Sequence, residues 1–190
     1  MDHKAWLATV PIERRQELTE RRDLPGLIHL AGHLGALFLI SVLIASKIPF
    51  WPLLLLPQAI LLACLFHLEH EATHSTPFKA AWLNRFAGHL TGFLLILPFQ
   101  WFTAFHMAHH KWTNIAGKDP ELTSVRPTTL VGWMWYFSGV PHWYRSFTLL
   151  LRLVLGTERP DYLSLRMQKR AEAEARIMLL WYVALIALIP

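Results

Sequence analysis

The sequence predicts an all-α integral membrane protein, formed by a transmembrane hairpin, interfacial amphipathic helices and a truncated third span. First, 54% of the 190 residues are hydrophobic, which is more than a soluble domain of this size usually carries. Second, residues 27–46 and residues 48–66 contain no Lys, Arg, Asp or Glu. Third, the basic residues flank these apolar runs and form no compact patch, which favours a membrane surface and argues against nucleic acid as a partner.

Residues 1–26 are predicted to form a cytosolic N-terminal segment, and residues 27–190 a single membrane-bound domain. The segment is charged, so it does not have the pattern of a secretory signal. We expect an amphipathic helix around residues 12–22. Cys64 is the only cysteine, which excludes a disulfide framework.

The two uncharged runs predict a transmembrane hairpin. At 1.5 Å per residue, residues 27–46 cover roughly 30 Å, enough to cross the hydrocarbon of a bilayer. Lys47, Pro49 and Pro52 mark the turn, and residues 48–66 return the chain to His67. Most basic residues lie at the open end of the hairpin, so the positive-inside rule places both ends in the cytoplasm.

A third apolar stretch, residues 86–105, is expected to be a broken segment in the cytoplasmic interface. It is long enough to cross a membrane, but Gly88, Gly92 and Pro98 disfavour a straight helix. A crossing would also carry the basic residues that follow to the opposite side of the membrane. We therefore expect this stretch to dip into the interface and return.

The structure of residues 107–189 is predicted from their amino-acid composition. Residues 107–128 are polar and typical of a loop, whereas the aromatic residues of 130–155 suit a helix at headgroup level and serve as interfacial anchors rather than as a cofactor site. The basic residues between 145 and 176 are expected to form a solvated, lipid-facing surface. Residues 177–189 would make roughly 20 Å of helix, too short for about 30 Å of hydrocarbon, and are expected to belong to a truncated span.

Two histidine clusters carry the candidate chemistry. In the first, HEATH at residues 70–74, the i, i+4 spacing puts His70 and His74 on one helix face. In the second, HMAHH at residues 106–110, the spacing brings His106, His109 and His110 to one face. Neutral imidazole is a common ligand of iron, zinc and copper. Polar clusters beside a membrane are costly without a partner, so both clusters point to metal.

Isolated histidines have a simpler interpretation. A single histidine at a membrane interface is usually a solvated amphipathic side chain. This is the interpretation for four residues outside the clusters: His3, His29, His89 and His142.

The first cluster also fits H-E-x-x-H, the zinc-protease pattern in which Glu71 would be the general base. A metzincin would have Gly at position 77 and His at position 80, where this chain has Pro77 and Ala80. The only later aspartates, Asp119 and Asp161, lie outside the apolar runs. A protease would also leave the second cluster unexplained.

Together, the two clusters and their flanks resemble the membrane-bound fatty acid desaturase family. Residues 70–78, HEATHSTPF, are similar to its first histidine box, and residues 106–114 with 119–122, HMAHHKWTN and DPEL, to its second box and tail. Weaker matches to bacterial members are LTER at 18–21, GLIHL at 26–30 and SGVP at 138–141.

The resemblance implies a cytoplasm-facing di-iron centre in a bacterial inner membrane. It implies iron ligation by His70, His74, His106, His109 and His110. The centre would use O₂ to introduce a double bond into a lipid-linked or carrier-linked fatty acyl chain. Electrons would come from a ferredoxin or a cytochrome b5. Three carboxylates are candidate partners that orient the imidazoles: Glu71, Asp119 and Glu121.

The family's third histidine box has no counterpart here, because His142 is the only histidine after His110. We therefore expect a partial chain that, alone, binds little iron and has no desaturase activity. Two alternatives stay open: a related di-iron lipid hydroxylase, or a non-catalytic membrane fragment that retains the boxes.

Overall fold

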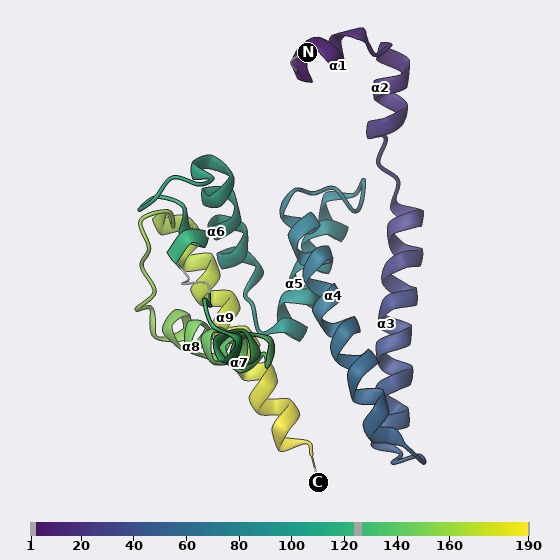
Figure 1. Cartoon of the computed structure of the whole chain (residues 1–190), viewed down its shortest axis with the longest axis vertical. Coiled ribbons are helices and arrows are strands. Elements are labelled where there is room, and N and C mark those ends of the chain that lie inside the picture. The colour runs from purple at the N-terminus through teal and green to yellow at the C-terminus, as the bar shows by residue number, and fades with distance from the viewer. Residues whose placement is uncertain (1–2, 124–126, 190) are drawn as a thin grey trace.

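The computed structural model describes residues 3–123 and 127–189, and within these residues it contains helices and no β-strand. The predicted all-α class is therefore confirmed. Figure 1 shows the arrangement of the α-helices, and the described residues also form two short 3₁₀ turns, η1 and η2. In chain order they are α1 (His3–Thr9), α2 (Ile12–Thr19), α3 (Asp23–Ala45), η1 (Trp51–Leu54), α4 (Leu55–Thr73), α5 (Ala81–Leu95), α6 (Phe99–Trp112), η2 (Pro120–Thr123), α7 (Leu130–Phe137), α8 (Val140–Leu155) and α9 (Leu165–Ala187).

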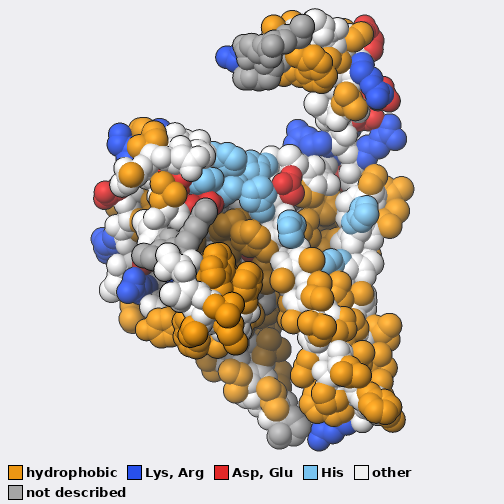
Figure 2. Space-filling view, in the orientation of Figure 1, with side chains coloured by type: hydrophobic (Ala, Val, Ile, Leu, Met, Phe, Trp, Pro, Cys, Tyr) orange, Lys and Arg blue, Asp and Glu red, His pale blue; other side chains and the backbone are white. Residues whose placement is uncertain are grey.

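Helices α3 and α4 form the predicted hairpin. Both lie in segments long and apolar enough to cross a membrane, with mean hydropathies of 2.2 and 1.8, and most of their side chains face outward (Figure 2). Helix α3 begins at Asp23, earlier than the predicted start at residue 27. The Asp23 carboxylate accepts a hydrogen bond from the backbone N–H of Ala80 at 2.8 Å, which ties the start of α3 to the start of α5.

Helices α1 and α2 lie beyond the start of α3, apart from the helical bundle (Figure 1). The expected helix near residues 12–22 is α2, which has no buried residue. Between α2 and α3, Arg21 Nη1 donates a hydrogen bond to the carbonyl of Ser75 at 2.6 Å. The division at residue 26 stays a prediction.

Helices α5 and α6 meet at a bend of 101°, which confirms that the third apolar stretch is broken. Ile96 ends α5 in the left-handed region at φ 56°, an unfavourable backbone conformation for a β-branched residue. Pro98 then precedes α6. Gly88 allows the close approach of the two helices, since a Cβ there would lie 2.4 Å from the Phe99 ring.

The expected loop over 107–128 is wrong at its start. Helix α6 continues to Trp112 because Ala108 and His106 are buried against the bundle, and η2 adds a short turn; residues 124–126 lie outside the described residues. The helix expected over 130–155 is divided into α7 and α8 at Gly139, whose φ is 76°.

The apolar run 177–189 is largely the C-terminal half of α9, which begins at Leu165 with a polar first half. Ala171, Ala175 and Met178 of α9 pack on Leu150 and Leu153 of α8. Helix α9 is not among the described helices that are long and apolar enough to cross a membrane.

Packing contacts fix the directions of the inner helices. Leu83 of α5 belongs to the same buried cluster as Leu30 of α3, and Leu95 of α5 belongs to the same cluster as Leu37 of α3. Helix α5 therefore runs in the same direction as α3 and antiparallel to α4. The C-terminal end of α4 thus lies on the same side as the starts of α3 and α5.

Candidate metal centre

Four histidines converge where the end of α4 meets α6. His70, His74, His106 and His110 each offer a ring nitrogen, and these nitrogens all lie within 4.8 Å of one another. Figure 2 shows the histidines gathered at the end of the bundle above its apolar surface. The two predicted clusters, separated in sequence, therefore form one site.

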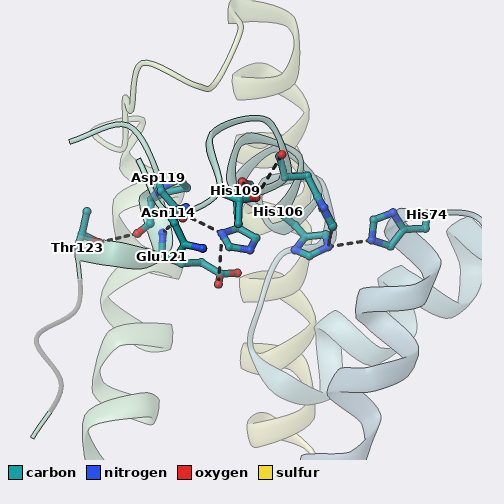
Figure 3. Close-up of polar contacts among 10 residues, drawn as sticks. His74, His106, His109, Asn114, Asp119, Glu121 and Thr123 are labelled. Carbon is teal, nitrogen blue, oxygen red and sulfur yellow. Dashed lines mark hydrogen bonds and ion pairs between the residues drawn. The ribbon is translucent and has the colours of Figure 1, made fainter. Parts of the chain in front are cut away.

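The helical spacing of each pair explains its contribution. His70 lies in the last turn of α4 and His74 is its C-cap, so both project from one face at the helix end. His106 and His110 occupy the last turns of α6 with the same spacing. Figure 3 shows His106 facing His74 across the gap between the helices.

The ring nitrogens are close enough for one metal ion. His106 Nε2 lies 2.9 Å from Nε2 of His74 and 2.9 Å from Nε2 of His110. Adjacent ligands of one ion, with metal–nitrogen bonds of about 2.1 Å, would lie about 3 Å apart. The arrangement therefore fits an ion bound by imidazoles from both helices.

The neutral form that metal binding requires is favoured at His74. Burial, together with the neighbouring rings of His110 and His70, lowers the pKa of His74 below its ordinary value. The ring is therefore neutral at neutral pH, and its nitrogen lone pair is available for a metal.

Glu71 contacts His70, the first histidine of the cluster. Its Oε1 lies 3.0 Å from His70 Nδ1, and its Oε2 accepts a hydrogen bond from Thr76 at 2.6 Å. Because a carboxylate accepts, Nδ1 of His70 carries the proton and the neutral ring presents Nε2. This carboxylate–imidazole pair is the usual outer arrangement of a metal-binding histidine.

His109 points away from the four-histidine cluster. Figure 3 shows its ring turned toward Asp119 and Glu121. His109 Nδ1 donates to Asp119 Oδ1 at 2.9 Å and lies 3.4 Å from Glu121 Oε2. Asp119 and Glu121 thus both contact His109.

Asp119 also organises the turn after α6. It is 2% exposed and accepts hydrogen bonds from the backbone N–H groups of Asn114 and Glu121. Burial alone would raise the pKa of Asp119, but the hydrogen bonds from His109 and these two N–H groups outweigh it and lower the pKa. The carboxylate is therefore ionised while it holds the His109 ring.

Glu174 of α9 is a functional candidate that the sequence did not indicate. Its two carboxylate oxygens accept the backbone N–H groups of Phe99 and Gln100 at 3.0 and 2.8 Å, and His89 lies 2.5 Å from Oε1. A carboxylate there satisfies the first free N–H groups of α6 and complements its dipole. The helix that carries His106 and His110 is thus fixed at its start by α9. His89, expected to be solvated, is half-buried in this contact.

Glu69, one residue before His70, is fully buried in α4. Neither of its carboxylate oxygens has a hydrogen-bond partner among the described residues. A carboxylate in an apolar helix is an unusual feature, and its position beside the first histidine of the cluster could have been noted from the sequence.

The cluster differs from a zinc-protease site. The described residues group His70 and His74 with two further histidines, and no carboxylate joins them. Glu71, which would be the general base, is engaged with His70 and Thr76. An all-imidazole site is compatible with iron, zinc or copper.

Fold and site together define a helical membrane protein with a histidine cluster that could hold a metal ion. The model of the family described as fatty acid desaturase matches residues 45–190. The chain therefore belongs to the fatty acid desaturase family, as the two histidine boxes predicted.

Several curated relatives match the chain over shorter stretches. It is 28% identical to the sn-1 oleoyl-lipid 12-desaturase of Anabaena variabilis, over 41% of this chain and 27% of the relative. It is 29% identical to the sn-1 acyl-lipid omega-3 desaturase (ferredoxin) of Nostoc sp. (strain 36), over 45% and 24%. It is 37% identical to the human fatty acid desaturase 3, over 34% and 15%. The chain thus spans about a quarter of the length of the first two relatives. No solved structure matches it significantly.

Proposed function

We propose that this protein takes part in O₂-dependent desaturation of a fatty acyl chain at a histidine-ligated di-iron centre. The observation that carries the proposal is the convergence of four imidazoles from α4 and α6 in a chain that belongs to the desaturase family. Bound iron would supply the oxidant for unactivated methylene groups, a reaction for which protein side chains alone are unsuited.

The first iron is assigned to the four converging histidines: His70, His74, His106 and His110. His109 is proposed as a ligand of the second iron. Its Nδ1 donates to Asp119, so Nε2 is the nitrogen left for a metal. Glu71 and Asp119 hold the rings of His70 and His109, and Glu121 assists at His109.

The proposed substrate is an acyl chain of a membrane lipid, and the proposed donor is a ferredoxin or a similar carrier. Three relatives are named as acyl-lipid or oleoyl-lipid desaturases, and one name includes ferredoxin. In balance, two hydrogen atoms leave the acyl chain, two electrons come from the donor and two protons from solvent. O₂ is reduced to two water molecules.

The test is gas chromatography of membrane lipids from a bacterial host that expresses the full-length gene with a ferredoxin and its reductase. We expect a new unsaturated acyl species that is absent when His74→Ala and His106→Ala are introduced together. An unchanged lipid profile, with the protein in the membrane and the donor reduced, would overturn the proposal.

A further inference from the structure

A groove between α5 and α9 combines positive charge with an apolar lining. It has a volume of about 720 Å³ and also touches the start of α6 at Gln100. Arg85 and Arg170 line it. Its larger apolar residues are Phe86, Leu90, Phe93, Ile177, Met178 and Trp181. No member of the four-histidine cluster lines this groove.

The two arginines lie at one end of the groove, and the aromatic residues Phe93 and Trp181 lie at the other. Helices α5 and α9 run in parallel, because His89 contacts Glu174 and, further along both helices, Phe93 stacks on Tyr182 at 4.6 Å. Arg85 and Arg170 each lie about one turn before the His89–Glu174 contact. Both arginines therefore mark one end, and Phe93 and Trp181 mark the other.

The direction from the charged end to the apolar end of the groove matches the direction from the open end of the membrane-spanning hairpin to its turn. Since α5 runs in the direction of α3, the arginine end lies on the side of Asp23 and the histidine cluster. The apolar end points toward the Lys47 turn, along the apolar length of the hairpin. From Arg85 to Phe93, α5 rises about 12 Å, which is close to the roughly 15 Å of hydrocarbon in one leaflet.

The two arginines lack a partner within the described part of the chain. Neither makes a hydrogen bond or an ion pair with another described residue. Glu174, the acidic residue of the groove, is engaged by His89 and by the N–H groups at the start of α6. The guanidinium groups are therefore available for an anion.

We propose that this groove binds an anionic phospholipid of the surrounding membrane. Its phosphate lies between Arg85 and Arg170, and one acyl chain follows the apolar lining toward Trp181. Arginine suits this role because its planar group donates two parallel hydrogen bonds to a phosphate. The site is separate from the histidine cluster and does not rest on the proposed desaturase activity.

The experiment is native mass spectrometry of the purified, delipidated full chain in detergent, titrated with palmitoyl-oleoyl phosphatidylglycerol, the matching phosphatidylcholine and oleate. We expect tighter binding of phosphatidylglycerol than of the other two. The double variant Arg85→Gln with Arg170→Gln should weaken it about twenty- to thirtyfold, since each basic residue near an anionic surface contributes about fivefold.

The matched control is Arg166→Gln with Lys169→Gln, which removes the same charge from exposed positions of α9 outside the groove. We expect less than a threefold change. Leu90→Trp fills the apolar part without changing charge and should also weaken phosphatidylglycerol binding, so it decides the matter if the arginine variant misfolds. The proposal is overturned if wild type binds both phospholipids equally, if it prefers oleate, or if the groove variants bind like the control.

Discussion

Each histidine of the two boxes is distinguished by what its ring contacts. His74, His106 and His110 face one another, whereas His70 and His109 each direct Nδ1 to a carboxylate. A ring held by a carboxylate keeps one orientation and one tautomer, which favours metal binding through the other nitrogen. The site therefore contains both converging ligands and residues that orient them.

We predict that His106→Ala weakens Fe²⁺ binding by more than about tenfold. Replacing even the partners of metal ligands lowers metal affinity about ten- to hundredfold. The measurement is anaerobic equilibrium dialysis of the purified chain. His67→Ala is the control, because His67 lies on α4 near the site and bonds only to the carbonyl of Cys64 in the described structure. Equal iron affinity in the two variants would contradict the assignment.

Among the elements, the corner between α5 and α6 positions the second histidine box. Its geometry depends on the close contact of Gly88 with Phe99 and on the left-handed Ile96 before Pro98. Glu174 then fixes the first turn of α6 from α9. Three helices thus determine where His106 and His110 meet α4.

Gly88→Ala should destabilise the protein by about 1–3 kcal/mol, since the added methyl would overlap the Phe99 ring. Unfolding in mixed micelles with increasing SDS, followed by circular dichroism, measures the change. Gly32→Ala in α3 is the control, because a Cβ there meets nothing within 4 Å. It should be neutral or stabilise by up to about 1 kcal/mol. Similar losses in both variants would show that the corner does not depend on this contact.

Glu174→Gln should loosen the start of α6. Replacing the charged cap should cost about 1.4 kcal/mol locally, which corresponds to about tenfold faster hydrogen exchange at the amides of Phe99 and Gln100. Exchange followed by mass spectrometry measures this. Glu172→Gln is the control, since Glu172 bonds to Gln168 and Arg176 of its own helix. Unchanged exchange in the Glu174 variant would argue against the capping role.

Over the whole molecule, the hairpin places the histidine cluster and the N-terminal segment on the same side of the membrane. Helices α3 and α4 are antiparallel (Figure 1), and His70 and His74 lie at the C-terminal end of α4, which is the open end of the hairpin. Lys47 lies at the opposite end. The basic residues of the open end favour the cytoplasm for this side.

This orientation predicts the labelling of cysteine variants in a Cys64→Ala background. In intact bacterial spheroplasts, a membrane-impermeant maleimide should label the Lys47→Cys variant. The Lys111→Cys variant, next to the second box, should be labelled only after permeabilisation. The reverse pattern, or equal labelling of both before permeabilisation, would show that the orientation is wrong.

Features that depend on local spacing could be predicted from the amino-acid sequence alone. The length of two uncharged runs predicts the hairpin, and the i, i+4 spacing predicts that histidines share a helix face. The contact between Glu71 and His70 could also be predicted from the sequence, because the two residues are neighbours in the chain. The break near Pro98 could be predicted because proline and glycine are unfavourable inside a helix.

Which of the histidines converge depends instead on how the helices pack against one another. His109 shares a short segment with His106 and His110, yet its ring turns to Asp119 while the other two face α4. The cap of Glu174 on α6 joins residues far apart in the chain. Such contacts depend on the rotation and spacing of packed helices, which are set by the close fit of side chains such as Phe99 against Gly88 rather than by any local periodicity.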